Sequence, residues 1–234
     1  MSEHAVIVVT GARKGLGRAL AEHFLAQGHA VAGISRQASD LEHAQYADFP
    51  ADVADEPAMA RAFVEIGRRF GRIDALVNNA GIAAMNHALL TTASGARRVF
   101  ETNTIGTVIA AREAAKQMRR ARRGRIVNLS SVAVPLAVAG EAVYAASKAA
   151  VESLTRVLAR EFGPLGITCN AVGPTPIDTD LIRGVGREKI QALLAQQAIA
   201  RMGEVRDVVN VVEFFLKPES DFITGQVVYL GGVW

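Results

Sequence analysis

The segment AVIVVTGARKGLG, residues 5–17, decides the fold of this 234-residue chain. Its first six residues are apolar and rich in valine, which predicts a buried β-strand. Gly11, Gly15 and Gly17 follow and lead into a helical pattern. Glycine lets the backbone of a turn approach a ligand, and a helix N-terminus offers free N–H groups to a phosphate. The segment therefore predicts a strand, a turn and a helix that bind the pyrophosphate of a dinucleotide.

The rest of the chain repeats this alternation of short apolar runs and helical patterns. Leu16, Leu20 and Phe24 recur every four residues, which gives the first helix one apolar face for packing on a sheet. Strands are predicted at residues 5–10, 30–35, 44–49, 75–79, 125–130, 167–172 and 226–230, the third being the weakest. Further helices are predicted at residues 57–70, 102–122, 143–162 and 205–216. This order is typical of an α/β fold whose parallel sheet is covered by helices on both faces.

We predict a single doubly wound Rossmann-type domain over residues 1–234, with a seven-stranded, mainly parallel sheet. No Ser/Gly linker, repeat or change in composition divides the chain. Residues 182–202 add a short helix without a following strand, which predicts a lid at the carboxyl end of the sheet. The apolar residues of this stretch would suit an acyl chain or would simply pack the lid helix; they are Leu181, Ile182, Ile190, Leu193 and Leu194.

The composition points to a soluble globular protein. Half of the residues are hydrophobic and 21% are charged, which argues against disorder. No apolar run reaches the length of a membrane span, and the N-terminus lacks the positive charge of a signal peptide, so we expect a cytoplasmic location. The single cysteine, Cys169, excludes an internal disulfide and is predicted to be a small buried residue. The five histidines show no metal-site spacing, and no metal is expected.

The net charge of +3 is concentrated in RRARRGR, residues 119–125. Such a run is either the solvated end of a helix or a docking patch for an acidic partner. It has no interleaved aromatic residues to stack bases, so nucleic-acid binding is not expected.

The end of the second predicted strand indicates which dinucleotide binds. A site for NAD usually has an acidic residue there that accepts a hydrogen bond from the ribose 2′-hydroxyl, but this chain reads GISRQ. Arg36 follows Ser35, and a guanidinium at this place, together with Arg13 or Lys14 of the glycine turn, could hold a 2′-phosphate. The prediction is NADP(H).

Two polar groups stand four residues apart in YAASK, Tyr144 to Lys148. On a helix they share one face, so the Lys148 ammonium would lie near the Tyr144 ring and lower the pKa of its hydroxyl. Ser131, in NLSSV, precedes the tyrosine by thirteen residues. The alternative is a helix with one half-buried tyrosine and one solvated lysine.

These motifs together carry a family resemblance over nearly the whole chain. TGARKGLG, the strand-end NNAG at Asn78 to Gly81 and YAASK resemble the motifs of the short-chain dehydrogenases/reductases, and within them the 3-oxoacyl-[acyl-carrier-protein] reductase type. The resemblance implies four catalytic residues: Asn103, Ser131, Tyr144 and Lys148. It also places Asp52 and Val53 at the adenine, Asn78 and Ala80 near its ribose, and Ile177 and Thr179 at the nicotinamide amide. The cofactor-binding residues predicted in this way are Gly11, Arg13, Lys14, Gly15, Leu16, Gly17, Ser35, Arg36, Asp52, Val53, Asn79, Ala80, Gly81, Tyr144, Lys148, Pro174, Ile177 and Thr179.

The implied reaction is hydride transfer to a carbonyl, with Tyr144 as general acid. By the resemblance, Ser131 holds the substrate oxygen, Lys148 binds the cofactor ribose, and Asn103 holds a water that links Lys148 to solvent. The resemblance also implies a homotetramer and, through the arginine run, a possible acyl-carrier-protein partner. Thr175 stands where the family usually has glycine, and Leu165 stands where a second basic docking residue is expected.

The first candidate substrate is a 3-oxoacyl thioester. The alternatives are another ketone or secondary alcohol, such as a sugar, polyol or steroid, or a dinucleotide-binding protein without catalysis.

Overall fold

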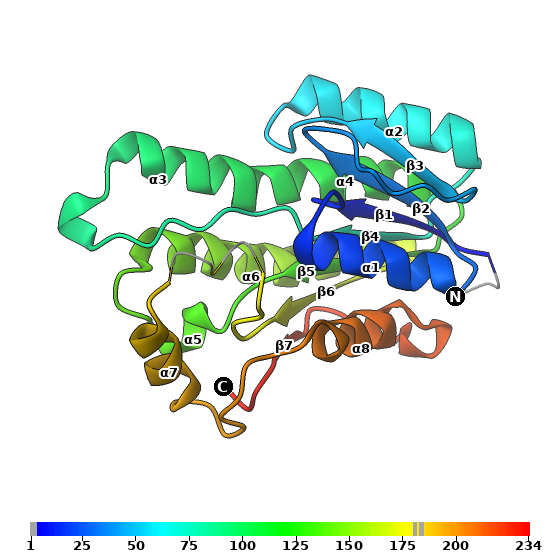
Figure 1. Ribbon diagram of the computed structural model, residues 1–234. Coiled ribbons are helices and arrows are strands. Elements are labelled where there is room, and N and C mark those ends of the chain that lie inside the picture. The colour runs from blue at the N-terminus through cyan, green and yellow to red at the C-terminus, as the bar shows by residue number, and fades with distance from the viewer. Residues whose placement is uncertain (1–3, 180–181, 183–184) are drawn as a thin grey trace.

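Seven parallel strands form one sheet at the centre of the molecule (Figure 1). The computed structural model describes residues 4–179, 182 and 185–234. The strand order is β3-β2-β1-β4-β5-β6-β7, so the order reverses between β1 and β4. The strands are β1 (Val6–Thr10), β2 (Ala30–Ser35), β3 (Tyr46–Pro50), β4 (Ala75–Asn78), β5 (Gly124–Leu129), β6 (Ile167–Gly173) and β7 (Val227–Tyr229). All seven predicted strands are confirmed, including the weak third one, which forms an edge of the sheet.

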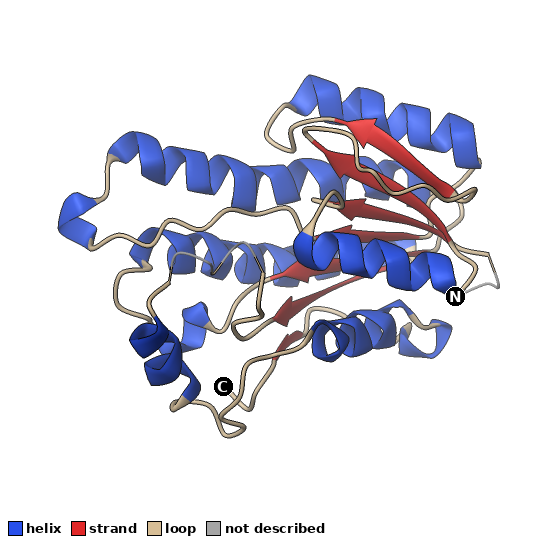
Figure 2. Ribbon diagram, viewed as in Figure 1, coloured by secondary structure: helices blue, strands red, loops and turns tan. Residues whose placement is uncertain are grey.

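Helices cover both faces of the sheet (Figure 2). One face packs against α1 (Gly15–Ala26) and α8 (Val205–Leu216), and the other packs against α2 (Glu56–Phe70), α4 (Gly106–Met118) and α6 (Ala142–Phe162). Each layer has its own apolar core because the strand side chains alternate between the two faces. Cys169 lies in one of these cores, and burial raises the pKa of its thiol to about 12, which fits the predicted inert residue.

The helix predicted over residues 102–122 begins earlier and ends sooner than expected. One continuous rod contains α3 (Ala93–Phe100), a π-turn over Glu101–Ile105 and α4 (Figure 1). The start was missed because α3 is short and buries only Val99. The arginines after Met118 form a turn in which Arg122 has a φ of 49°, so they do not extend the helix.

Shorter helical elements lie at the carboxyl end of the sheet and in the loops. The helix predicted in this stretch is present as α7 (Arg187–Leu194), where Leu193 packs with Val132 and Val233, and its role as a lid stays a prediction. Residues 180, 181, 183 and 184, which include Leu181 of the predicted lid, lie outside the described residues. The other short elements are η1 (Ala88–Leu90), α5 (Ala133–Leu136), η3 (Gly163–Leu165) and η4 (Pro218–Ser220). None of the helices in the described part of the chain is long and apolar enough to cross a membrane.

Candidate active site

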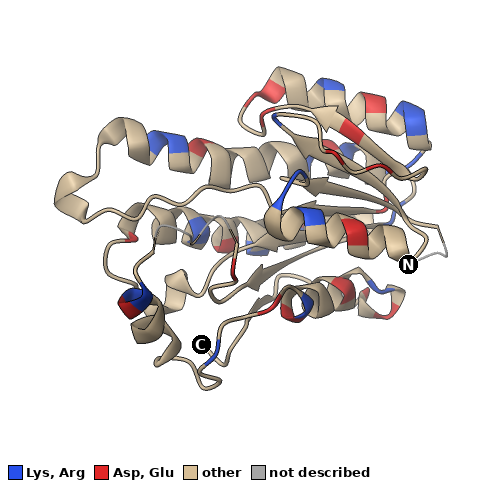
Figure 3. Cartoon of the chain, viewed as in Figure 1, with Lys and Arg blue, Asp and Glu red and all other residues tan. Residues whose placement is uncertain are grey.

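The glycine turn lies at the carboxyl end of β1, beside the point where the strand order reverses. Gly11 has a φ of 71°, and a Cβ on Gly17 would lie only 2.3 Å from the Gly11 carbonyl oxygen. The turn therefore needs glycine at both positions. The first turn of α1 has no acidic residue. The loop leading into α1 is basic (Figure 3). These features fit a pyrophosphate, which would accept hydrogen bonds from the first amides of the helix.

Asn79 holds the glycine turn in place with its side chain. Its Nδ2 donates to the carbonyl oxygens of Thr10 at 3.0 Å and Gly11 at 3.4 Å. The Thr10 hydroxyl in turn accepts hydrogen bonds from the backbone N–H groups of Asn79 and Ala80. The predicted cofactor residue Asn79 thus supports the backbone that would meet the cofactor, whereas Gly81 is exposed beyond it.

The end of β2 carries the two residues predicted to select NADP(H). Ser35 Oγ accepts a hydrogen bond from Arg13 N at 3.1 Å, so this serine connects β2 to the glycine turn. The Arg36 side chain is exposed at the end of the strand. The two nearby carboxylates are already bound within the protein. Asp40 accepts a hydrogen bond from Arg18, and Asp48 accepts one from the Tyr46 hydroxyl at 2.7 Å and one from the Ser39 backbone at 2.9 Å.

The residues predicted to flank the adenine follow β3. The Asp52 side chain is exposed, and its Oδ1 accepts a hydrogen bond from Ala54 N at 3.0 Å. Val53 is buried against α4, where a Cβ on Gly106 would lie 2.7 Å from Val53 Cγ2. Val53 therefore packs in the core as well as bordering this end of the sheet.

The predicted catalytic residues come together at the carboxyl end of β5. Ser131 follows β5, and its side chain lies close enough to the Tyr144 hydroxyl to lower the pKa of that group. Tyr144 and Lys148 lie on successive turns of α6, and Lys148 Nζ is 5.9 Å from the centre of the tyrosine ring. Lys148 Nζ also donates to the Leu129 carbonyl oxygen at 2.7 Å. Both α6 side chains are buried.

Asn103 connects the loop after β4 to the same region of α6. Its amide exchanges two hydrogen bonds with the Ile82 backbone, at 2.8 and 2.9 Å, and donates a third to Ser147 Oγ at 3.0 Å. A Cβ on Gly81 would lie 3.3 Å from Asn103 Oδ1 and 3.5 Å from Lys148 Nζ, so the two side chains border the same glycine. The Asn103 amide is thus engaged by protein groups, and its role in holding a water stays a prediction.

The electrostatic prediction for Tyr144 was wrong for the protein without a nucleotide. Burial raises the pKa of the Tyr144 hydroxyl to about 12; the hydrogen bond with Ser131 acts in the opposite direction, and the Glu141 carboxylate raises the pKa further. Burial also lowers the pKa of Lys148 to about 8. The sequence spacing predicts that the two groups are close, but it does not reveal that both are buried, and desolvation disfavours the charged form of each.

The segment predicted to hold the nicotinamide amide follows β6. Thr179 lies next to the glycine turn, since a Cβ on Gly15 would be 3.9 Å from Thr179 Cβ. Ile177 is buried and pairs with Gly203, and the Pro174 carbonyl oxygen accepts a hydrogen bond from Val132 N at 3.1 Å. Thr175 is also buried, and its Oγ1 makes no hydrogen bond to any residue that the structure describes. A buried hydroxyl without a partner at this edge suits a polar ligand such as a nucleotide.

Two acidic residues of α6 were missed by the sequence analysis. Glu141 is the N-cap residue of α6 but makes no side-chain cap hydrogen bond, and burial raises the pKa of its carboxyl group. Glu152 is buried one turn after Lys148, where it contacts Ser130 and Tyr229. The spacing of Tyr144, Lys148 and Glu152 was a usable signal, because it predicts one helix face.

The arginine run does not lie at the mouth of this site within one chain. Arg122 and Arg123 are exposed before β5, whereas Ser131 follows the strand. Six residues of strand separate the two ends by about 20 Å at ~3.3 Å per residue. Arg125, by contrast, is buried in β5. Leu165 packs against the core, which explains the apolar residue at the second docking position.

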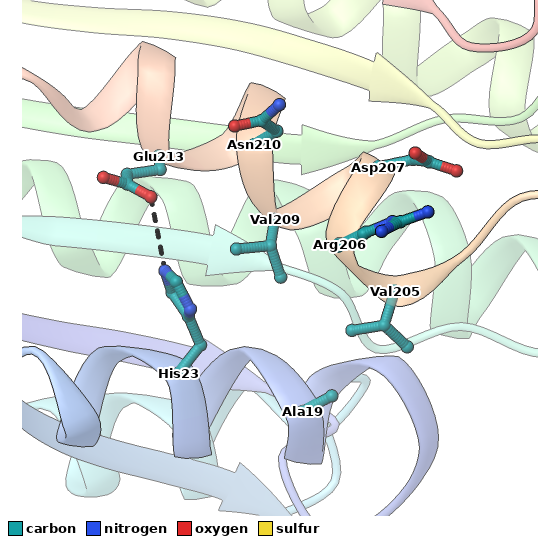
Figure 4. Close-up of a pocket in the computed structure, with 8 residues that line it drawn as sticks. All are labelled: Ala19, His23, Val205, Arg206, Asp207, Val209, Asn210 and Glu213. Atoms are coloured by element: carbon teal, nitrogen blue, oxygen red, sulfur yellow. Dashed lines mark hydrogen bonds and ion pairs between the residues drawn. The ribbon is translucent and has the colours of Figure 1, made fainter.

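A groove of about 670 Å³ lies elsewhere, between α1 and α8 (Figure 4). His23 and Glu213 cross it with a 3.3 Å contact between Nε2 and Oε2. None of the predicted site residues lines it, so it is separate from the candidate active site. Within the part of the chain that the structure describes, no three His, Cys, Asp or Glu residues are grouped as a metal site would require.

Comparison with known proteins agrees with this arrangement. A family model described as "Enoyl-(Acyl carrier protein) reductase" matches residues 11–232. The chain is 33% identical over 238 residues to the 3-oxoacyl-[acyl-carrier-protein] reductase FabG of Vibrio cholerae, covering 98% of this chain and 97% of that protein. It is 34% identical to a short-chain type dehydrogenase/reductase of Picea abies, with 97% and 91% covered. The ligand-free aldohexose dehydrogenase of Thermoplasma acidophilum superposes with a TM-score of 0.88 at 33% identity, covering 98% of this chain and 94% of that one. The chain therefore belongs to the short-chain dehydrogenase/reductase family of oxidoreductases.

Proposed function

We propose that this protein is an NADPH-dependent carbonyl reductase that converts a ketone to a secondary alcohol, with a 3-oxoacyl thioester as the first candidate substrate. The observation that carries the proposal is the contact between the Ser131 and Tyr144 side chains, with Lys148 beside them, at the same edge of the sheet as the glycine turn. The similarity to 3-oxoacyl-[acyl-carrier-protein] reductases over almost the full length supports the choice of thioester.

The side chains have complementary parts in this reaction. Bound NADPH supplies a hydride to the carbonyl carbon. The Ser131 hydroxyl donates a hydrogen bond to the carbonyl oxygen, and Tyr144 transfers its phenolic proton to that oxygen as negative charge develops. With a pKa of about 12 the phenol is fully protonated at neutral pH, and it is still more acidic than an alcohol, which resembles water at ~15.7.

Lys148 stabilises the ionised form of the general acid Tyr144 and helps to bind the nucleotide. Its pKa of about 8 leaves it mostly protonated at neutral pH, so its ammonium favours the phenolate that forms when Tyr144 gives up its proton. The same ammonium is placed to donate to ribose hydroxyls of the nucleotide. Asn103 holds the Ile82 segment against α6 and thereby keeps the space beside Gly81 open for that ribose.

The preference for NADP(H) is supported by the charges at the end of β2. Arg36 is exposed there, and Asp40 and Asp48 are engaged by Arg18, Tyr46 and Ser39. The residue that follows β2 is thus basic rather than acidic, and the guanidinium of Arg36 suits a 2′-phosphate.

A second candidate substrate class is favoured by Glu141. Its partly buried carboxylate lies close enough to Tyr144 to raise the pKa of the phenol, and it makes no hydrogen bond within the described residues. A carboxylate in such a place is stabilised by a ligand that carries hydroxyl donors. A hydroxylated ketone or sugar would supply them, and one structural neighbour is an aldohexose dehydrogenase.

An acyl-carrier-protein partner and a homotetramer remain part of the proposal. Arg119, Arg120, Arg122 and Arg123 form an exposed basic surface suited to an acidic carrier. Since this surface is at the amino end of β5, a carrier bound there would serve the active site of a neighbouring copy. Reversing the charges of Arg122 and Arg123 should raise KM for a carrier-linked thioester but not for a short thioester analogue.

A single-subunit mass by light scattering would contradict the tetramer.

The decisive experiment is a substrate screen that follows NADPH by absorbance. The panel contains 3-oxoacyl thioesters, simple ketones, aldoses, polyols with NADP⁺, and steroids, and Tyr144→Phe is the control. Turnover of the thioesters above all others supports the first candidate, and preference for hydroxylated substrates, lost in Glu141→Gln, supports the second. NADPH binding by the wild type without turnover of any class would show a non-catalytic dinucleotide-binding protein and contradict the proposal.

A further inference from the structure

Three consecutive residues at the end of β5 each lie against a different turn of α6. The Leu129 carbonyl accepts from Lys148 Nζ at 2.7 Å, and Ser130 Oγ donates to Glu152 Oε1 at 2.5 Å. The Ser131 side chain lies close enough to the Tyr144 hydroxyl to lower its pKa. The α6 residues are spaced by four, so they form one stripe along the helix. This stripe fixes how β5 and α6 lie against each other at the active site.

Glu152 is the member of the stripe with no part in the proposed reaction. Its side chain is only 6% exposed, and its Oε1 also accepts a hydrogen bond from the Tyr229 hydroxyl at 2.7 Å. The nearest cation is Arg156, with 3.9 Å between Nη2 and Glu152 Oε2. Two neutral hydroxyls and a distant guanidinium compensate a buried carboxylate only in part. An apolar residue would be the more stable choice unless the hydrogen bonds serve another purpose.

Tyr229 extends the same contact to the last strand. It is in β7, and its ring lies against β6, where a Cβ on Gly173 would be 2.3 Å from Tyr229 Cδ1. Gly173 precedes Pro174, whose carbonyl oxygen accepts from Val132 N. The carboxylate of Glu152 thus joins α6, the end of β5 and β7 immediately behind the segment that contains Ser131.

We propose that Glu152 is a positioning residue of the active site: by accepting hydrogen bonds from Ser130 and Tyr229 it holds the adjacent Ser131 in line with Tyr144 and Lys148. The expected effect on turnover rests on the proposed function. The placement of Ser131 by Glu152 does not depend on that function. Both hydroxyl partners of Glu152 Oε1 belong to the protein, so the proposed role acts through Ser131.

The chain contains a matched control in Thr155. This residue is also on α6 and fully buried, and its hydroxyl accepts a hydrogen bond from Asn128 Nδ2 of β5 at 2.9 Å. It joins the same helix to the same strand, but at a distance from Ser131. Thr155→Val and Glu152→Leu each replace a buried hydrogen-bonding side chain by an apolar one of similar size. Glu152→Gln keeps an acceptor oxygen for Ser130 and Tyr229 and serves as the conservative variant.

Two measurements test the proposal. The first is amide hydrogen exchange in the nucleotide-free protein at Ala133, whose N–H donates to Ser131 Oγ at 3.1 Å. The second is the separation of kcat from KM for NADPH in the substrate screen. We expect Glu152→Leu to accelerate exchange at Ala133 and to lower kcat by roughly tenfold to a hundredfold with KM for NADPH unchanged. Glu152→Gln should behave as wild type, and Thr155→Val should change neither quantity.

Other outcomes overturn the proposal. If Glu152→Leu and Thr155→Val have equal effects on exchange and kcat, the hydrogen bonds of Glu152 are only structural. If Glu152→Gln loses activity without a change at Ala133, the charge matters rather than the position. Should Glu152→Leu fail to fold, Ser130→Ala removes the same hydrogen bond and must accelerate exchange at Ala133. Faster exchange in these variants, combined with a wild type that reduces no substrate, would keep the positioning role and reject the proposed function.

Discussion

The two halves of the active site are built in opposite ways. In the nucleotide half, the side chains of Asn79 and Ser35 bind the backbone of the glycine turn and of the residue before it, and the backbone is left to meet the ligand. In the catalytic half, backbone and neighbouring side chains surround Tyr144 and Lys148, and these side chains are the proposed reactive groups. Burial shifts the pKa values of the catalytic pair, whereas the basic residues of the nucleotide half are exposed.

The difference shows what each half demands of the chain. A phosphate is recognised by the positions of several backbone amides, so the conformation of the glycine turn must be preserved. Proton transfer depends on the pKa of single side chains, so the burial of Tyr144 and Lys148 must be preserved. Substitutions in the nucleotide half should therefore change the affinity for NADPH, and substitutions in the catalytic half should change turnover.

The largest effect is expected for Tyr144→Phe. Without the phenolic proton, turnover should fall by ~10²–10⁴-fold, as is usual for loss of a general acid. NADPH affinity should remain close to that of the wild type, because the glycine turn is untouched. Steady-state kinetics and fluorescence titration with NADPH would measure the two quantities. A variant that keeps a tenth of the activity would show that another group is the acid.

Lys148→Met should separate stability from activity. Burial lowers the pKa of Lys148 from 10.5 to about 8, which corresponds to a penalty of about 3 kcal/mol at neutral pH. Removing the charge also removes the hydrogen bond to the Leu129 carbonyl, worth about 1 kcal/mol. We expect a nucleotide-free variant that is inactive yet more stable, by about 2 kcal/mol at pH 7.

The pH dependence of this difference follows from the lowered pKa. Below pH 8 both the folded and the unfolded wild type carry the proton, and the penalty is complete. Between pH 8 and 10.5 the folded protein loses the proton while the unfolded chain keeps it, so wild-type stability rises with pH and the gap to the variant narrows. Urea unfolding at pH 7 and pH 9 measures this, and a variant less stable than wild type at pH 7 would contradict it.

Asn79→Ala tests the nucleotide half. The substitution leaves the carbonyl oxygens of Thr10 and Gly11 without their amide donor and loosens the glycine turn. We expect a loss of about 1–3 kcal/mol in stability and a weaker affinity for NADPH, although the side chain points to the protein. Calorimetric titration checks the affinity. Asn170→Ala, which removes a similar side chain-to-backbone bond at Ile223, is the control and should leave NADPH affinity unchanged.

The smallest effect is expected for Arg36→Ala. An exposed guanidinium that binds a 2′-phosphate contributes modestly, so KM for NADPH should rise by roughly tenfold while KM for NADH stays the same. The ratio of the two constants is the measurement, repeated at low and high salt. If KM rises equally for NADPH and NADH, Arg36 does not bind the 2′-phosphate.

The sheet could be predicted from the sequence because its strands are short apolar runs with no competing pattern. Even the weak candidate at β3 formed, since β2 offers it a parallel partner from Val31 to Ser35. The start of α3 was not predicted, because Thr92 caps a helix of only eight residues that buries a single valine. So short a segment offers few positions from which an apolar face can be recognised.

The sequence predicted which residues form the candidate site better than it predicted their pKa values and contacts. Motif spacing identified Ser131, Tyr144 and Lys148, which the structure brings together. It did not predict the direction of the Tyr144 pKa, which depends on how much of the chain covers the ring. Nor did it predict that Asn79 binds Thr10, because that contact joins strands 69 residues apart in sequence.

The π-turn at Glu101–Ile105 makes the length of this segment as important as its composition. It accommodates one more residue per turn than the α-helix on either side, and one residue corresponds to a rotation of about 100°. Deleting Thr102 would restore regular geometry, but it would put α3 and α4 out of phase with each other. The Asn103 amide would then swing away from Ile82 and Ser147. Amino-acid substitutions should therefore be tolerated at the exposed positions of this stretch, whereas insertions and deletions should not.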